Sequence, residues 1–351
     1  MQLDQTHVVI RLRSLVEIGD LALVMIRSYP AALGYGFVIG MLPWAIVNAL
    51  ILSWIPITEL EYGFSDDEAA WELTRYLTWM PFLVFCQTPI AGLLTTAFLG
   101  QAVFDSETRW SGVWSDVRRH FWRCTWSLGV LRMPIAATVV CAVGWFQPVN
   151  AFRDAVLLLV LLMIVSIQRS SRPFLPEILL LEQCPLKSKA GAAGLTASRR
   201  TTALHTPMSG DLLGRFLVVS LVMTLLMLSF YWSLIFFRGI ALGNWNHDVL
   251  ALTVFYPLAL WAVAGISVVV RFLSYLDTRI RLEGWEVELA IRAEAIRQFG
   301  TDITLETHAN QVVATEESTI DGAVSQPPLV GVSRTTTPPD TSAVVSTGSQ
   351  S

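Results

Sequence analysis

Charge is scarce along most of this chain. Charged residues make up 15% of its 351 residues and hydrophobic residues 53%, and the mean hydropathy is +0.54. A water-soluble domain usually carries about 25% charged residues. The deficit falls in six continuous apolar runs, and a run of roughly 20 such residues can cross about 30 Å of hydrocarbon. The runs lie at about 31–55, 79–103, 126–147, 154–169, 213–237 and 249–271, and an extension back through Ala151 would lengthen the shortest.

Short segments of alternating polarity, which are typical of a transmembrane β-barrel, do not account for these runs. The stretch LLLVLLMIV at 157–165, for example, is apolar without a break. Inside a bilayer, helices of this kind satisfy all of their backbone hydrogen-bonding groups within one segment. We therefore predict an all-α fold, a polytopic membrane helix bundle with six transmembrane helices and additional interfacial helices on the cytoplasmic side.

Motifs for catalysis or metal binding are also lacking. The four cysteines form no CxxC pair, and the five histidines are scattered without an HExxH motif. Neither a GxSxG elbow nor a phosphate-binding loop occurs. The first 14 residues contain no apolar core of the kind found in a secretion signal. We expect no enzymatic activity, no cofactor, no metal site and no cleaved targeting peptide.

Arginine and lysine are concentrated in alternate loops. Twenty of the 24 basic residues lie in the N-terminal segment, the loops after the second and fourth runs, and the C-terminal part. The other three loops hold one arginine each, namely Arg75, Arg153 and Arg238. Because basic loops remain on the cytoplasmic side, we predict a cytoplasmic-membrane protein with both termini in the cytoplasm.

Four regions follow from this pattern. Residues 1–30 contain an amphipathic helix that starts at a Ser14–Glu17 capping box and lies at the membrane surface or docks under the bundle. Residues 31–272 form the transmembrane domain, and 273–300 a charged cytoplasmic helix. The aromatic-free segment 301–351 is expected to be a disordered tail.

Two further segments read as surface helices. In 109–123 the residues Trp110, Trp114, Val117 and Phe121 share one face, with His120 on the polar side, which suits a headgroup interface better than nucleic acid. The apolar segment FLPEILLLE is too short to span, so it should lie at the surface with Glu177 and Glu182 exposed or paired.

Small residues and prolines interrupt the runs. Gly36 and Gly40 form a GxxxG pair, and Gly92, Thr96 and Gly100 form a second stripe, both of which favour close helix contact. Prolines inside the runs, where they kink helices, are Pro43, Pro89, Pro134 and Pro257.

Polar residues inside the runs are few. Gln87 is expected to form a hydrogen bond with a neighbouring helix, and Asn48 lies in the first run. Arg132 either snorkels to the cytoplasmic edge, pairs within the bundle or contacts a substrate. Because no Asp, Glu, Lys or His lies well inside a run, proton-coupled transport is disfavoured.

The segment YLDTRIRLEGWEVE at the end of the last run resembles the closing motif of a bacterial multi-pass family. That family is related to the membrane domain of glycerophosphoryl diester phosphodiesterases. The segments RLRSLVEIGDLAL, with Arg11, Arg13, Glu17 and Asp20, and PEILLLE are similar to other parts of its pattern. The resemblance covers roughly residues 8–292 and implies a six-helix membrane domain, with no phosphodiesterase domain in this chain.

Three functions are compatible with these features. The first is a scaffold or partner subunit that acts through cytoplasmic surface helices and contacts the bilayer, a membrane protein partner or a second copy. Its candidate residues are Asp277, Arg279, Arg281 and Glu283, with Arg13, Asp20, Glu177 and Glu182 as their partners. The second is a transporter of a lipid or small uncharged molecule, with a cavity lined by Asn48, Gln87 and Arg132. The third is a membrane-embedded enzyme.

Overall fold

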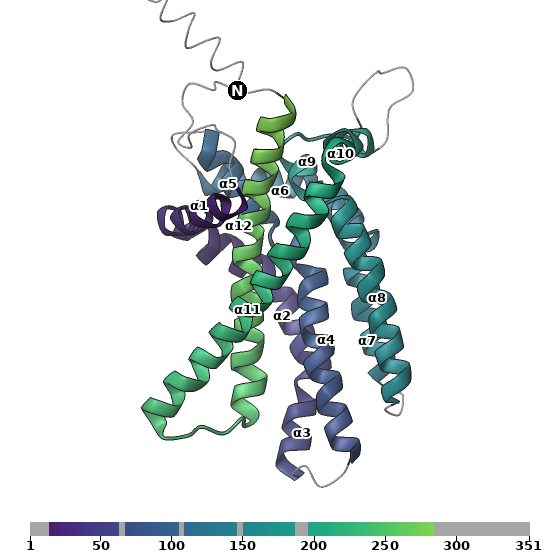
Figure 1. The fold of residues 1–351 in the computed structure, drawn as a ribbon, viewed down its shortest axis with the longest axis vertical. Coiled ribbons are helices and arrows are strands. Elements are labelled where there is room, and N and C mark those ends of the chain that lie inside the picture. Colours follow the sequence, from purple (N-terminus) through teal and green to yellow (C-terminus); the bar gives the residue numbers. More distant parts are fainter. Residues whose placement is uncertain (1–13, 63–66, 105–108, 146–149, 187–195, 284–351) are drawn as a thin grey trace, which may run out of the picture. The chain divides into compact units, whose positions relative to one another are not determined.

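The computed structural model describes residues 14–62, 67–104, 109–145, 150–186 and 196–283, and all of its regular elements are helices. Arg13, residues 284–300 of the predicted charged helix and the predicted tail at 301–351 lie outside the described residues. The helices are α1 (Leu15–Ser28), α2 (Val38–Leu52), α3 (Trp54–Tyr62), α4 (Asp67–Ala91), α5 (Leu93–Phe104), α6 (Trp110–Cys124), α7 (Pro134–Trp145), α8 (Ala151–Ser171), α9 (Leu175–Leu180), α10 (Ala197–His205), α11 (Ser209–Leu242) and α12 (Tyr256–Glu283) (Figure 1). The π-helical segments are η2 (Ala32–Phe37), η3 (Thr125–Val130) and η5 (Ala251–Phe255).

Four helical stretches are long and apolar enough to cross a membrane, and two bent pairs raise the number to six if each pair is one span. The four stretches are Ala32–Leu52, Ala151–Ser171, Ala197–Leu242 and Ala251–Glu283. This arrangement confirms the all-α class with four to six candidate spans. The chain is therefore an integral multi-span membrane protein.

The two bent pairs occur where prolines interrupt the helix. The first, α4 with α5, bends by 43° between Ala91 and Leu93, just after Pro89. In the second, α6 continues through η3 to Val130, and the chain then bends by 51° before α7 begins at Pro134. The sequence pattern divides this region into a surface helix at 109–123 and a span at 126–147 that is kinked at Pro134. In the structure the break falls instead at residues 131–133, because Pro134 cannot continue the preceding hydrogen-bond ladder.

The helix α12 lies at the centre of the packing and contacts α1, α4, α5, α10 and α11 (Figure 1). In its apolar stretch 56% of the residues are buried, against 6% for the stretch that contains α11. Of the large apolar residues on α11, most are exposed. Since hydrocarbon can cover such surfaces, α11 has the composition of a helix that faces lipid on most sides.

The N-terminal helix α1 starts at the predicted capping box, in which Ser14 and Glu17 cap each other. It contacts α12 and buries Ile18, Ala22 and Met25 in the bundle. Of the two placements that the sequence allows, the structure therefore has the docked one.

Close contacts between helices occur at the predicted small residues. A Cβ on Gly40 would collide with the carbonyl oxygen of Ala91, and one on Gly36 would lie 3.3 Å from the backbone nitrogen of Thr95. Gly92 packs against Val268, and Gly100 against Leu181. The absence of side chains thus sets how closely α2 and η2 approach α4 and α5.

Candidate functional site

The charged end of α12 presents two sets of residues. Tyr275, Arg279 and Glu283 are four residues apart and share one side of the helix, while Asp277 and Arg281 share another. The two sets contact different helices. Residues of the closing motif therefore contact other helices on two sides of α12.

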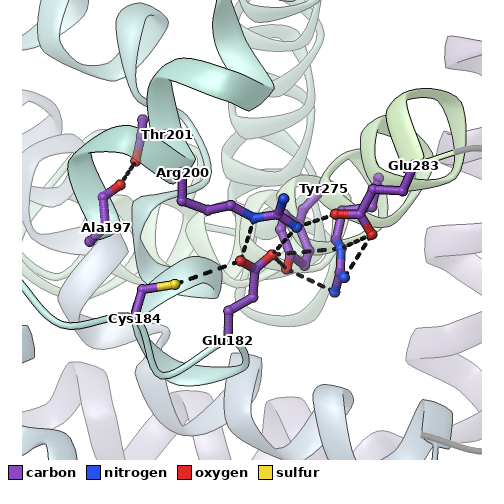
Figure 2. A network of polar contacts seen from close by, with 8 residues as sticks. Glu182, Cys184, Ala197, Arg200, Thr201, Tyr275 and Glu283 are labelled. Carbon is purple, nitrogen blue, oxygen red and sulfur yellow. Dashed lines mark hydrogen bonds and ion pairs between the residues drawn. The ribbon is translucent and has the colours of Figure 1, made fainter. Parts of the chain in front are cut away.

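The first set takes part in a closed ring of four charges, which Figure 2 shows and which we call the charge ring. Arg200 of α10 donates to Glu182 at 2.5 and 3.0 Å. The guanidinium of Arg279 lies 3.6 Å from Glu182 and 2.8 Å from Glu283. Arg200 also donates to Glu283, which closes the ring. Two arginines and two glutamates thus alternate, and the ring as a whole is neutral.

Further contacts fix the orientation of Glu182. The Tyr275 hydroxyl donates to its Oε1 at 2.7 Å, and Arg279 donates to the hydroxyl oxygen at 3.4 Å. The Cys184 thiol lies 3.9 Å from Oε2 (Figure 2). Burial and the negative charge of Glu182 raise the pKa of the Cys184 thiol above its ordinary value. Glu182 is therefore the central acceptor of the ring.

The second set joins α12 to α11. Asp277 is only 3% exposed and accepts hydrogen bonds from Arg215 and Arg281, each at 2.9 Å. Arg215 also pairs with Asp211 at 3.0 Å. A buried carboxylate with one partner removed typically costs 3–5 kcal/mol, so this pairing restrains α11 against α12.

The short helix α9 differs from its sequence interpretation as a surface segment. All six of its residues are buried, because α5, α6 and α10 pack around it. Glu177 is completely buried and accepts from Arg271 of α12 at 2.7 Å. Glu177 thus satisfies the paired alternative.

The remaining candidate partners do not join these clusters within the described residues. Asp20 is exposed on α1. Three arginines that the sequence interpretation treats only as basic loop residues are instead central to the pairing, namely Arg200, Arg215 and Arg271. Arg215 and Arg271 lie at the ends of predicted apolar runs, which is a sequence signal for their position, whereas Arg200 carries no such signal.

The predicted interhelical hydrogen bond of Gln87 is present, and its partner is Asn48. The two buried amides exchange hydrogen bonds at 2.8 Å in both directions, and Gln87 also donates to Thr138 at 3.2 Å. This trio joins α2, α4 and α7. Both amides thus take part in contacts between helices.

A cavity of about 610 Å³ lies between α4, α8, α11 and α12. Neither Asn48 nor Gln87 lines it, whereas Arg132 does. At one end its walls include four arginines, Arg132, Arg169, Arg215 and Arg271. Toward the other end they are apolar and include Met223, Met227, Leu260, Val263 and Ala264. We call the two ends the arginine end and the apolar end.

The cavity also reaches the lipid-facing surface of the bundle. Leu217 of α11 lines it and is 59% exposed, and the neighbouring lining residue Thr224 is exposed as well. Because α11 is a candidate span, a side chain exposed there faces hydrocarbon. The cavity therefore opens laterally toward the bilayer.

Arg132 lies at the bend before α7 and is only 7% exposed. Its guanidinium donates to the carbonyl oxygen of Arg172 and interacts electrostatically with Arg169, Arg271 and Glu177. Arg169 donates to the carbonyl oxygen of Phe85 at 2.8 Å and stacks over the Phe85 ring at 4.0 Å. Both arginines are thus held in position by backbone acceptors.

Among the described residues, no group of three His, Cys, Asp or Glu side chains could hold a metal ion. The fold and the site together define an integral multi-span helical membrane protein with a lateral cavity. No protein-family model, curated protein or solved structure matches the chain.

Proposed function

We propose that this protein binds a membrane lipid in the lateral cavity and transports it between the two leaflets. The observation that carries the proposal is the cavity itself, which is about 610 Å³, mostly apolar, polar at one end and open beside Leu217. Its volume lies in the range of about 300–1,000 Å³ that is usual for ligand sites. A lipid has the same distribution of polar and apolar parts.

Segments that can change conformation surround this cavity. The helix α4, which belongs to the first bent pair, provides one wall, and Arg132 lies at the bend of the other pair. The helix α11 provides another wall and buries little of its surface in the bundle. Arg215 is held against α12 by Asp277, so movement of the part of α11 beyond Arg215 would widen the lateral opening, which supports transport rather than permanent lipid binding.

Photocrosslinking tests the binding step. A benzophenone amino acid at Met223, which lines the cavity, should crosslink to lipid in vesicles and should lose that crosslink when the cavity is filled by Ser220→Trp. The matched control is Leu221→Trp, one residue further along α11, which is 61% exposed and does not line the cavity. A crosslink that survives Ser220→Trp would contradict binding in the cavity.

Reconstitution tests the transport step. Purified protein in vesicles should accelerate the flipping of a fluorescent phospholipid, measured by chemical quenching of the outer leaflet. Ser220→Trp should reduce the rate about tenfold, while Leu221→Trp should leave it unchanged. Equal rates with and without protein would refute transport.

A second candidate is the scaffold or partner subunit, acting without enzymatic activity of its own. It is favoured by the charge ring and the Asp277 pair, which restrain α10, α11 and α12 as one polar surface. Under mild detergent a partner or second copy should co-purify with the wild type and dissociate from Arg200→Gln. Recovery of the protein alone would count against this role.

The membrane and the orientation are part of the proposal. Arg215 of the cavity lies near the start of α11 and pairs with Asp277, two residues from Arg279 of the charge ring. The arginine distribution supports a cytoplasmic location for this side. We also propose kinship with the membrane-domain family that the closing motif resembles. The Asp277, Arg279, Arg281 and Glu283 pairings give that motif a structural role.

A further inference from the structure

We infer that the arginine end of the cavity binds the phosphate of an anionic phospholipid, with Arg132 and Arg169 as its principal ligands. The inference rests on the proposed function, because it requires a lipid in the cavity, and it adds the chemical class of the headgroup. A zwitterionic phospholipid carries a compensating positive charge, whereas the site described below has positive charge in excess.

The four arginines of the cavity differ in their partners. Arg271 pairs with Glu177, and Arg215 pairs with Asp211 and Asp277. Arg132 and Arg169 hydrogen-bond to backbone carbonyl oxygens and, within the part of the chain that the structure describes, have no carboxylate partner. Two positive charges are therefore left without a counter-charge.

Burial makes this excess costly. Arg132 is 7% exposed, and it interacts electrostatically with the like charges of Arg169 and Arg271 as well as with Glu177. A buried charge that is not compensated is unfavourable, because burial removes its hydration. A bound anion would remove the repulsion, and a phosphate accepts several hydrogen bonds from guanidinium groups at once.

One guanidinium nitrogen of Arg271 is available to donate a hydrogen bond to such an anion. The Nη2 nitrogen of Arg271 is buried and has no hydrogen-bond partner, while its Nε is occupied by Glu177. Buried nitrogens without a hydrogen-bond partner are rare in native proteins, because each one is energetically unfavourable. An oxygen ligand at the arginine end would satisfy it.

The depth of the site matches a phospholipid. Arg169 lies two residues before the end of α8, and Arg215 lies near the start of α11, so the arginine end is at the headgroup level of these spans. From Arg215 to Met227 the lining of α11 extends over roughly 18 Å at about 1.5 Å per residue. One leaflet is about half of the roughly 30 Å of hydrocarbon. The cavity thus has the length of acyl chains in a single leaflet.

The experiment compares headgroups on the full chain. Protein with benzophenone at Met223 is reconstituted in vesicles that contain equal amounts of phosphatidylglycerol and phosphatidylcholine, and crosslinked lipids are identified by mass spectrometry. Phosphatidylglycerol should be preferred about tenfold, because its phosphate charge is not compensated, whereas the choline cation of phosphatidylcholine would be repelled by the arginines. Arg169→Gln and Arg132→Gln should each abolish most of that preference.

Two variants control for charge and for folding. Arg119→Gln removes the same charge from an exposed position on α6 and should keep the preference. Arg169→Lys keeps the charge and should restore part of it, which separates binding from a general loss of structure. If Arg132→Gln does not fold, Arg169→Gln alone decides.

Each remaining result has one interpretation. Equal crosslinking to both lipids overturns the anionic site but leaves the lipid-binding function intact. An absence of crosslinks to either lipid refutes the proposed function itself. Loss of the phosphatidylglycerol crosslink on addition of millimolar inorganic phosphate assigns the site to free anions and overturns the lipid assignment.

Discussion

The amides of Asn48 and Gln87 show how uncharged polar side chains are accommodated inside the helix bundle. Each is completely buried, and each both donates to and accepts from the other. A buried polar group in hydrocarbon is tolerated when its hydrogen bonds are satisfied within the protein. The pair therefore specifies how α2 meets α4.

Removal of one amide should cost more than removal of both. Asn48→Ala leaves Gln87 buried and incompletely bonded, so we expect a loss of about 1–2 kcal/mol in the free energy of unfolding. The double variant Asn48→Leu with Gln87→Leu should recover most of that loss, because no unpaired amide remains. Denaturation in detergent measures both. Additive losses would show that the two amides do not interact.

The thiol of Cys184 reports on the charge ring. Burial and Glu182 raise its pKa, so Glu182→Gln should lower that pKa and increase the thiolate fraction at a given pH. In a background without the other three cysteines, alkylation of Cys184 at pH 8 should be faster in Glu182→Gln than in the parent. Its rate-against-pH curve should shift to lower pH.

A distant acid provides the control for this measurement. Asp211→Asn removes a carboxylate from the start of α11, outside the charge ring, and should leave the alkylation curve of Cys184 in place. A rate for Glu182→Gln that is unchanged or slower would contradict the contact between Glu182 and the thiol.

At the level of helices, the sequence predicts apolar stretches well because lipid solubility depends on local composition alone. It also predicts interruptions, since Pro89 and Pro134 fall at the two bends. It does not predict that η3 continues α6, because both sides of the bend are apolar. Likewise, Trp114 and Phe121 are exposed on α6, whereas Val117 packs inward with His120, which the pattern places on the polar side.

The clusters of charge were harder to predict than the helices. The closing motif identifies Asp277, Arg279 and Glu283, but their partners Arg200 and Arg215 lie more than sixty residues away in the chain. Pairings of this kind depend on which helices become neighbours. Composition predicts only that such arginines lie near a membrane surface. The packing of the helices determines which acidic residue each arginine pairs with.

The contact of α2 with α4 depends on the lack of a side chain at Gly40. Gly40→Ala should reduce the free energy of unfolding by about 1–3 kcal/mol, because the added methyl group would collide with the Ala91 carbonyl oxygen. The matched control is Gly214→Ala on α11, where no atom lies within 4 Å. It should be stabilising by roughly 0.5–1 kcal/mol. Equal effects of the two substitutions in thermal denaturation would contradict close packing at Gly40.

At the scale of the whole molecule, charged pairs lie near both ends of the long helix α11. Arg215 pairs with Asp277 near its start, close to Arg200 and Arg279 of the charge ring, while Arg238 pairs with Asp248 at its far end. The apolar middle between these ends contains the amide trio and the apolar end of the cavity. A lipid bound with its phosphate at the arginine end would keep its charge at the interface throughout binding.

The number of crossings can be decided by labelling single cysteines in a cysteine-free background. If each bent pair is one span and the orientation is the proposed one, Ser111→Cys and Ser198→Cys lie on the cytoplasmic side, and Asn150→Cys and Asn246→Cys on the outer side. An impermeant maleimide added to intact cells should therefore label the second pair and spare the first until the membrane is opened. The pair Ser111 and Asn150 is decisive, because they flank the 51° bend. Labelling of both from the same side would mean that α6 and α7 form a re-entrant hairpin, and six crossings would be wrong.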